Sequence, residues 1–285
     1  MDDDTQIRTK GRFDAAYDAV LARWGGVTAL ETTSEFGLTR VHACGPTGAP
    51  PVLLLHGGGA TSTAWSTVAT ALGRTHRVYA SDLIGDVGRS VPGDRRPRTP
   101  ADLMTWLDAV RAELGLQRAT LIGHSYGAWM ALAYTLGHPD RVDRLALLDP
   151  SDCFSGFRAG YLLRALPMLL RPNENRARRF IEWETGGRAL DPDWLTVYAL
   201  GAAGSPRPRI VLPKRPSRTA LGELHVPTLV ALAQDSRAID VDRVAAAARG
   251  ALPDVRIEVL PDSSHHSLPG HEPGELTTIL ADFLS

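Results

Sequence analysis

The chain has 285 residues, of which 44% are hydrophobic, enough for a large buried core in one α/β domain or in two smaller domains. Its formal net charge of -1 gives no electrostatic case for nucleic acid or an anionic membrane surface as a partner, so we expect a small neutral molecule. Cys44 and Cys153 are too far apart to suggest a disulfide framework, and the lack of an apolar signal region or of an apolar run near about 18 residues predicts a soluble, cytoplasmic protein without a membrane span.

The amino-terminal part of the chain predicts one helix followed by an antiparallel hairpin. Apolar residues recur at helical spacing through residues 13–24. Residues 27–31 and 36–43 alternate between apolar and polar side chains, as two paired strands do. Residues 51–56 form an apolar run that leads into Gly57-Gly58-Gly59, and such a run is typical of a strand buried on both faces.

Helices and strands alternate from here to residue 149. Spacing and apolar runs predict helices near residues 63–72, 101–114 and 128–136, and strands at residues 77–81, 119–123 and 145–149. Because each strand follows its own helix, the pattern is typical of a parallel sheet with helices on its faces.

The alternation stops after residue 150. Helical spacing recurs at residues 161–170, 177–184 and 194–200, followed by a segment rich in proline and arginine at residues 205–218. We interpret residues 151–222 as a helical cap over the sheet, and residues 1–150 and 223–285 as the core domain. The core resumes with strands at residues 227–233 and 255–260 and helices at residues 240–250 and 275–284.

The sequence Gly123-His124-Ser125-Tyr126-Gly127 joins a predicted strand to a predicted helix. A serine in such a sharp turn takes strained backbone angles, and glycines two residues to either side let the strand and the helix pass closely. The turn lifts the serine hydroxyl clear of the sheet, and the first amides of the next helix point at whatever it attacks. The pattern therefore predicts that Ser125 is a nucleophile, in preference to an ordinary glycine turn.

A serine nucleophile needs a base to accept its proton and a third group to orient that base. Residues 261–269 follow the last predicted strand and contain His265 and His266 in a loop rich in serine and proline. If the strands are parallel, this loop and Ser125 meet at the same edge of the sheet. One of the two histidines is therefore the candidate base.

These motifs, in this order, resemble the α/β-hydrolase family over nearly the whole chain. The resemblance implies an α/β fold with a mostly parallel central sheet flanked by helices, and a helical cap inserted after the strand that follows the nucleophile helix. In that family the loop after the third strand often reads His-Gly-X, and here it reads His56-Gly57-Gly58. The resemblance therefore implies an oxyanion hole made by the backbone amides of Gly58 and Tyr126.

Which histidine is the base depends on how the loop is aligned with the family pattern. Counting from Pro261 places His265 on the family histidine. Counting back from Leu268-Pro269 and Pro273 places His266 there. We prefer His266 and keep His265 as the alternative.

The acid is where the chain departs from the family pattern. The commonest family acid stands in Gly-X-X-Asp, but Ala233-Gln234-Asp235-Ser236 puts a serine at that place and Asp235 one residue early. A second position that the family uses, the end of the strand after the nucleophile, is occupied by Asp149. We prefer Asp149 and keep Asp235 as a close alternative. More remote options are Asp152, Asp240 and Asp262.

The resemblance implies a serine hydrolase that cleaves a small carboxylic ester through an acyl-enzyme. Lactone, thioester or amide hydrolysis and perhydrolysis are alternatives on the same core, and a receptor or scaffold without activity is the alternative of a different class. The sequence has no motif for a metal ion or a nucleotide cofactor, so we expect neither. Five aromatic residues of the cap are candidates for an acyl pocket above Ser125: Phe154, Phe157, Tyr161, Trp183 and Trp194.

Overall fold

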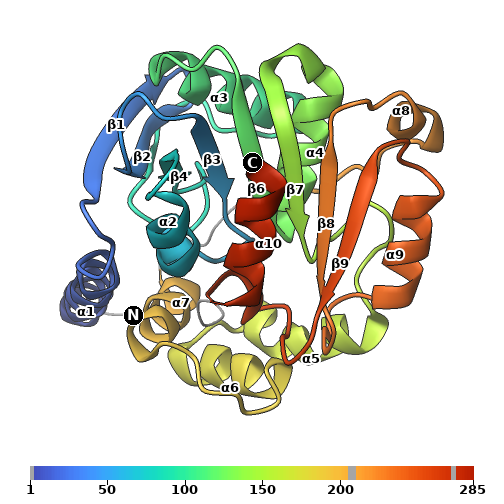
Figure 1. Ribbon diagram of the computed structural model, residues 1–285. Helices are drawn as coiled ribbons and strands as arrows, with labels where there is room; N and C mark the ends of the chain where they lie inside the picture. Colours follow the sequence, from blue (N-terminus) through green and yellow to red (C-terminus); the bar gives the residue numbers. More distant parts are fainter. Residues whose placement is uncertain (1–2, 205–209, 271–273) are drawn as a thin grey trace.

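The computed structural model describes residues 3–204, 210–270 and 274–285 (Figure 1). Residues 205–209 of the segment rich in proline and arginine, and Pro273 of the histidine loop alignment, lie outside the described residues. The strands are β1 (Thr28–Ser34), β2 (Gly37–Cys44), β3 (Pro51–Leu55), β4 (Arg77–Ser81), β5 (Val91–Pro92), β6 (Ala119–His124), β7 (Val142–Leu148), β8 (Thr228–Ala233) and β9 (Val255–Leu260).

The helices are α1 (Asp3–Leu21), α2 (Ser66–Leu72), α3 (Pro100–Glu113), α4 (Tyr126–Gly137), α5 (Ala159–Leu170), α6 (Glu174–Glu184), α7 (Pro192–Ala203), α8 (Arg218–Gly222), α9 (Val241–Arg249) and α10 (Glu275–Leu284). Short 3-10 helices span Ser62–Trp65, Pro139–Arg141 and Leu268–Gly270.

All these strands belong to one sheet with the order β1-β2-β4-β3-β6-β7-β8-β9, and β5 pairs with β2. From β4 to β9 the neighbouring strands are parallel, whereas β2 is antiparallel to both β1 and β4. The predicted hairpin therefore forms one edge of the sheet. The prediction of a mostly parallel central sheet flanked by helices is confirmed.

The central strands are buried on both faces, which explains their apolar sequences. Every residue of β6 and of β8 is buried. The edge strands β1 and β9 instead alternate with exposed residues, because one face or one end of each meets water. The apolar runs thus mark the middle of the sheet.

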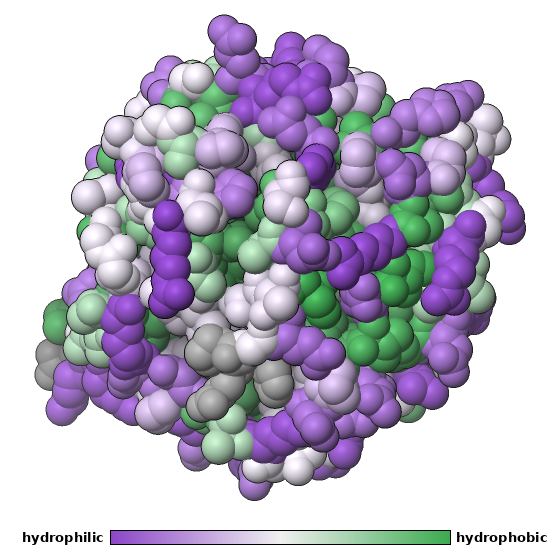
Figure 2. All heavy atoms as spheres, viewed as in Figure 1, coloured by the Kyte–Doolittle hydropathy of each residue, from purple (hydrophilic) through white to green (hydrophobic). Residues whose placement is uncertain are grey.

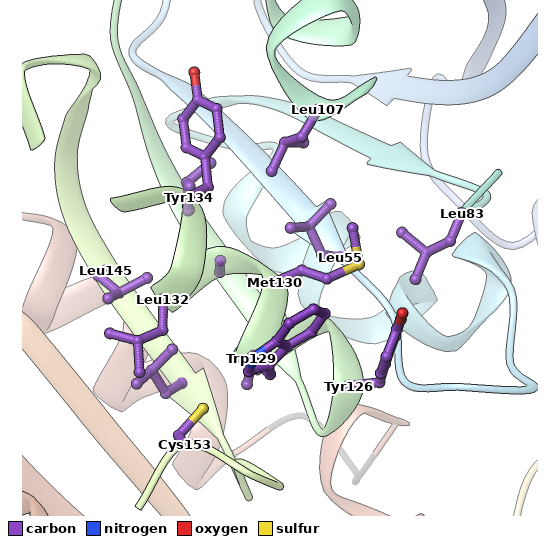
Figure 3. Packing of buried hydrophobic residues seen from close by; sticks show 14 of the residues in the cluster. Leu55, Leu83, Leu107, Tyr126, Trp129, Met130, Leu132, Tyr134, Leu145 and Cys153 are labelled. Atoms are coloured by element: carbon purple, nitrogen blue, oxygen red, sulfur yellow. The ribbon is translucent and has the colours of Figure 1, made fainter. Parts of the chain in front are cut away.

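Helices cover the sheet in two layers (Figure 1). α2 and α10 cover one face, where Leu72 and Leu280 are fully buried. α3, α4 and α9 cover the other, and Figure 3 shows Trp129 and Met130 of α4 packed near Leu55 of β3. These layers hold the turn between β6 and α4 in a rigid setting.

α5, α6 and α7 come between β7 and β8, where the sequence predicts an insertion, and they lie together at one end of the molecule (Figure 1). Each begins earlier than the apolar spacing predicts. Asn173 accepts a hydrogen bond from an amide of the first turn of α6, and Asp191 does so for α7. These polar caps start the helices ahead of their first buried residues.

α1 packs against α7, and Arg23 forms ion pairs with Asp191 and Asp193 at 2.6 and 2.8 Å.

Candidate active site

Ser125 lies in the sharp turn between β6 and α4. Its backbone angles, φ 52° and ψ -112°, are strained for a residue with a side chain. A Cβ on Gly123 would lie 2.2 Å from the carbonyl oxygen of Gly127, and a Cβ on Gly127 would lie 2.1 Å from that of Leu55. Such distances are far inside van der Waals contact, so only glycine fits on either side of Ser125.

Ser125, His265 and Asp149 form a hydrogen-bonded line at the edge of the sheet. Ser125 Oγ lies 2.9 Å from His265 Nε2, and His265 Nδ1 lies 2.6 Å from Asp149 Oδ2. Because a carboxylate only accepts hydrogen bonds, Nδ1 carries the proton, and Nε2 is left to accept the serine hydroxyl. The three residues are 5%, 2% and 0% exposed, so the line is shielded from water.

The structure corrects the choice between the two histidines, because His265 and not the preferred His266 faces Ser125. His266 Nδ1 lies 3.1 Å from Glu184 Oε2, and its Nε2 lies 3.5 Å from the hydroxyl of Tyr198. The rings of His265 and His266 are inclined by 75°, since neighbouring side chains in a turn diverge. Only one of them can reach the serine.

Asp149 follows β7 and has a positive φ of 42°. Its Oδ1 accepts the amide of Ala233 at 3.1 Å, and its Oδ2 accepts the hydroxyl of Ser236 at 2.6 Å in addition to the His265 ring. A fully buried carboxylate needs such donors to offset the loss of water. Ser236 stands at the place of the commonest family acid, and sequence reasoning did not foresee its contact with Asp149.

The alternative acid, Asp235, does not reach the histidine. Its carboxylate is partly exposed and forms an ion pair with Arg188 at 2.5 Å. Among the remote options, Asp152 lies 3.8 Å from Arg215, and Asp240 accepts an amide of the first turn of α9. Asp262 is exposed.

The residues predicted for the oxyanion hole lie next to the serine. A Cβ on Gly58 would be 3.8 Å from the Cβ of Tyr126, so the two residues face each other. Tyr126 is the first residue of α4, and its amide therefore has no acceptor within the helix. The next amide of the glycine loop, that of Gly59, donates to Asp86 at 3.0 Å and holds the loop in place. Burial raises the pKa of Asp86.

Glu184, at the end of α6, holds the backbone of the histidine loop. It is 1% exposed, and its carboxylate accepts hydrogen bonds from the amides of His265 and His266 at 3.0 and 3.1 Å. The hydroxyl of Ser264 and the ring of His266 also donate to it, both at 3.1 Å. Four donors converge on one carboxylate.

These donors decide the ionisation of Glu184. Burial acts to raise its pKa, but the hydrogen bond and charge of His266 and the charge of His265 outweigh burial and lower the pKa to about 2. Burial lowers the pKa of His266, and its bond to Glu184 offsets only part of that effect. Sequence reasoning missed Glu184, although a carboxylate three residues after Ile181 and four after Phe180, both buried, is a signal of a buried acid.

Aromatic side chains from the predicted insertion surround the histidines. The rings of Phe157 and Tyr161 have their centroids 6.3 and 6.0 Å from that of His265, and Tyr161 also contacts Trp183. Trp194 stacks on Tyr198, and Tyr198 in turn contacts the ring of His266. Two of the five aromatic candidates for an acyl pocket thus lie directly against the histidine beside Ser125.

His124, which precedes the serine, also contacts this loop. Its Nε2 lies 2.9 Å from the carbonyl oxygen of His265, so this nitrogen carries a proton and donates it. Burial lowers the pKa of His124 well below its usual value. The ring therefore acts as a neutral hydrogen-bond donor that fixes the backbone of His265.

Neither a metal-binding cluster nor a membrane-spanning helix is found among the described residues. No group of three or more histidine, cysteine, aspartate or glutamate residues in this part of the chain is arranged to hold a metal ion. None of the described helices combines the length and the apolar character needed to cross a membrane.

The model of the alpha/beta hydrolase family matches residues 52–278, and the chain belongs to this family. Carboxylesterase YbfK of Bacillus subtilis is 34% identical over 176 residues, which cover 61% of this chain and 58%, less than two thirds, of that protein. The uncharacterized carboxylesterase nap of the same organism is 28% identical over 262 residues, 89% of this chain and 86% of that protein.

Solved structures are similar over the full length. The naproxen esterase of Bacillus subtilis superposes with a TM-score of 0.89 at 27% identity, and covers 100% of this chain and 99% of that one. The carboxylesterase CesB (YbfK) of the same organism has a TM-score of 0.88 at 26% identity, with 97% and 98% covered. The predictions of the family, the fold and a hydrolase are confirmed.

Proposed function

We propose that this protein is a carboxylesterase that cleaves a small carboxylic ester with Ser125 as nucleophile, His265 as base and Asp149 as acid. The single observation that carries the proposal is the hydrogen-bonded line from Asp149 through His265 to Ser125, at 2.6 and 2.9 Å. Two relatives from Bacillus subtilis that are named carboxylesterases support it. The tautomer of His265 leaves Nε2 ready to accept a proton.

In the first half-reaction, Ser125 Oγ attacks the ester carbonyl while its proton passes to His265 Nε2. The carboxylate of Asp149 stabilises the imidazolium that forms. The carbonyl oxygen gains negative charge, and the amides of Gly58 and Tyr126 donate hydrogen bonds to it. The bond to the alcohol oxygen then breaks, the proton on Nε2 passes to the leaving alcohol, and an ester of Ser125 remains.

The second half-reaction repeats these steps with water. Water gives a proton to His265 Nε2 as its oxygen attacks the acyl carbon, and the same two amides stabilise the second oxyanion. The bond between the acyl carbon and Ser125 Oγ breaks, and the proton returns to Oγ. The carboxylic acid leaves, and the enzyme is restored.

Residues 151–222 act as a cap over this site in the proposal, and residues 1–150 and 223–285 form the catalytic core. Phe157 and Tyr161 lie against His265, which makes them the best candidates to contact the acyl group. Ser125 is only 5% exposed, so the cap must move before an ester can reach it.

A fluorophosphonate probe tests the proposal, because it labels only an activated serine. We expect the probe to modify Ser125, as located by mass spectrometry of the digested protein, and the Ser125→Ala variant to stay unlabelled. That variant should keep its fold and lose turnover by several orders of magnitude. If the probe labels the wild type, fresh protein that has not met the probe is then assayed with a panel of esters, lactones, thioesters and amides. No labelling of the folded wild-type protein would favour a receptor or scaffold without activity.

A further inference from the structure

The outward face of α5 is made of leucines. Five of them are between 45% and 70% exposed: Leu162, Leu163, Leu166, Leu169 and Leu170. Spacings of three and four residues put them on one side of the helix. Tyr161 and Ala165, on the opposite side, are buried against the rest of the chain. The leucine stripe is therefore not needed for packing α5 onto the molecule.

Scattered exposed leucines are common on protein surfaces, whereas a contiguous group marks a contact with a partner. Of the ten large hydrophobic side chains that are exposed in the described part of the chain, five belong to this stripe. Figure 2 shows a separate hydrophobic area, which lies over β8 and β9 and is surrounded by hydrophilic atoms. α5 lies beyond the lower ends of these strands, at the end of the molecule that α6 and α7 share (Figure 1).

One arginine of α5 and two of α6 line a hollow between these helices. This hollow of about 340 Å³ is lined by Arg164, Arg176 and Arg179 together with Pro167, Met168 and Phe180. Arg164 lies 5.6 Å from the ring centre of Trp183. Arg176 and Arg179 donate to backbone carbonyl oxygens of their own segment.

None of these three arginines forms an ion pair with a described residue, and the nearby Glu174 is already paired with Arg12 and Arg178. The sequence explains the imbalance: residues 158–179 contain six arginines and one acidic residue, a local charge of +5 in a chain whose net charge is -1. The expectation from net charge, that no anionic surface would be a partner, does not apply to this segment.

We propose that α5 and the first turns of α6 dock on the surface of an anionic lipid assembly, with the leucine stripe among the acyl chains and the arginines against the headgroup phosphates. An apolar stripe beside basic side chains is the combination that binds lipid interfaces. Here α5 carries the stripe and Arg164, and the neighbouring α6 carries Arg176 and Arg179. The apolar stripe matches the acyl chains, and the unpaired guanidinium groups match phosphates, with which arginine forms paired hydrogen bonds.

A second copy of the chain fits this face less well. A two-fold dimer brings the same patch of both subunits together. The arginines of the two hollows would then lie close to each other, and α5 offers no acidic residue to offset them. An anionic lipid surface complements both the apolar and the charged part of the patch.

The docking would act directly on the cover of the candidate site. Tyr161, on the inner face of α5, lies 6.0 Å from the ring centre of His265 and stacks on Phe157 at 5.2 Å. Lipid contacts on the outer face of α5 therefore act on the same helix that shields His265. The binding itself does not depend on the proposed esterase activity and is tested without a substrate.

Co-sedimentation with large unilamellar vesicles measures the binding. We expect the full chain to sediment with vesicles of phosphatidylcholine and phosphatidylglycerol, and much less with phosphatidylcholine alone. Added salt should release part of it, since the arginine contribution is screened. Arg164→Gln with Arg179→Gln should lower partitioning onto the anionic vesicles at least about tenfold, because each arginine near such a surface contributes about a fivefold factor.

The apolar part is tested with Leu163→Glu and Leu170→Glu, which place charges on the two most exposed positions of the stripe. We expect at least about a tenfold fall in partitioning. The matched control is Val91→Glu, an equally exposed apolar residue on β5, which should bind as the wild type does. Melting temperatures check that all variants fold. If the variant with two glutamates does not fold, the uncharged pair Leu163→Gln with Leu170→Gln takes its place.

Three results would overturn the proposal. The wild-type protein could remain in solution with both kinds of vesicle, or the leucine variants could bind as well as the control. The third is a dimer, detected by light scattering, that the leucine variants abolish, because the stripe would then belong to a contact between two copies of the chain.

Discussion

Ser236 donates a hydrogen bond of 2.6 Å from its Oγ to Oδ2 of Asp149. Ser236 occupies the place where the α/β-hydrolase family most often has its acid, and Asp149 stands at the end of the neighbouring parallel strand. The two ends are adjacent, so a carboxylate from either can reach the same histidine. In this chain the carboxylate of Asp149 follows β7, and the hydroxyl of Ser236, after β8, holds that carboxylate by a hydrogen bond.

Ser236→Ala removes this support and leaves Asp149 in place. We expect turnover of a soluble ester such as 4-nitrophenyl acetate to fall about threefold to tenfold, because a hydrogen bond to a charged group contributes roughly 1.5–3 kcal/mol and only part of that orients the histidine. The control is Ser34→Ala, a half-buried serine on β1 at the far edge of the sheet. Full activity in Ser236→Ala would show that the contact has no part in orienting His265.

The acid itself is identified by a pair of substitutions. Asp149→Asn should lower turnover at least about a hundredfold, since the amide cannot stabilise the imidazolium and favours the wrong tautomer of His265. Asp235→Asn should change turnover less than about tenfold, because its carboxylate is paired with Arg188 outside the line. Both proteins are checked for folding by circular dichroism. The reverse pattern would assign the acid to Asp235 and contradict the proposed mechanism.

The fold and the turn around Ser125 follow from local sequence, because their constraints are local. Buried central strands need apolar runs, and the strained turn needs glycine at positions 123 and 127, where any Cβ would overlap the backbone. Both requirements can be read within a few residues. That is why the sheet, its crossover helices and the candidate nucleophile could all be predicted.

The histidine could not be chosen from the sequence, because its orientation depends on a distant residue. Glu184 lies 81 positions before His265, and its carboxylate accepts hydrogen bonds from the backbone amides of both histidines. These bonds fix the loop so that the ring of His265 faces Ser125 and the ring of His266 faces α6. Alignment of the loop alone carries no information about that contact. The pairing of Ser236 with Asp149, 87 positions apart, escaped prediction for the same reason.

Substitution of each histidine tests the corrected choice. His265→Gln should lower turnover by at least about three orders of magnitude, because it removes the proton acceptor of Ser125. His266→Gln should lower it less than about tenfold, since that ring faces Glu184 and Tyr198. Turnover is measured with the same soluble ester. A larger loss in His266→Gln than in His265→Gln would restore the interpretation drawn from the sequence.

Glu184 should also contribute a pH-dependent part of the stability. Its pKa is lowered from 4.5 to about 2 in the folded protein. A lowered pKa stabilises the fold at pH values above about 4.5, and this contribution is lost as the pH falls toward about 2. The difference in unfolding free energy between the wild type and Glu184→Gln, measured in urea, should shrink by roughly 3 kcal/mol over that interval. A difference that is constant with pH would contradict the ionised state of Glu184.

The same variant tests whether Glu184 positions the histidine that faces Ser125. A glutamine has one acceptor oxygen in place of two, so it cannot hold the amides of both His265 and His266 as the carboxylate does. We expect kcat to fall at least about tenfold with a smaller change in KM, because the histidine is less well placed for proton transfer.

The split between kcat and KM separates this role from a merely structural one. A Glu184 that only stabilised the loop would leave both constants of the folded variant unchanged. Glu182→Gln, two residues earlier and exposed, is the matched control and should leave kcat and KM unchanged. If Glu184→Gln lowers the melting temperature but keeps the kcat and KM of the wild type, Glu184 only stabilises the loop.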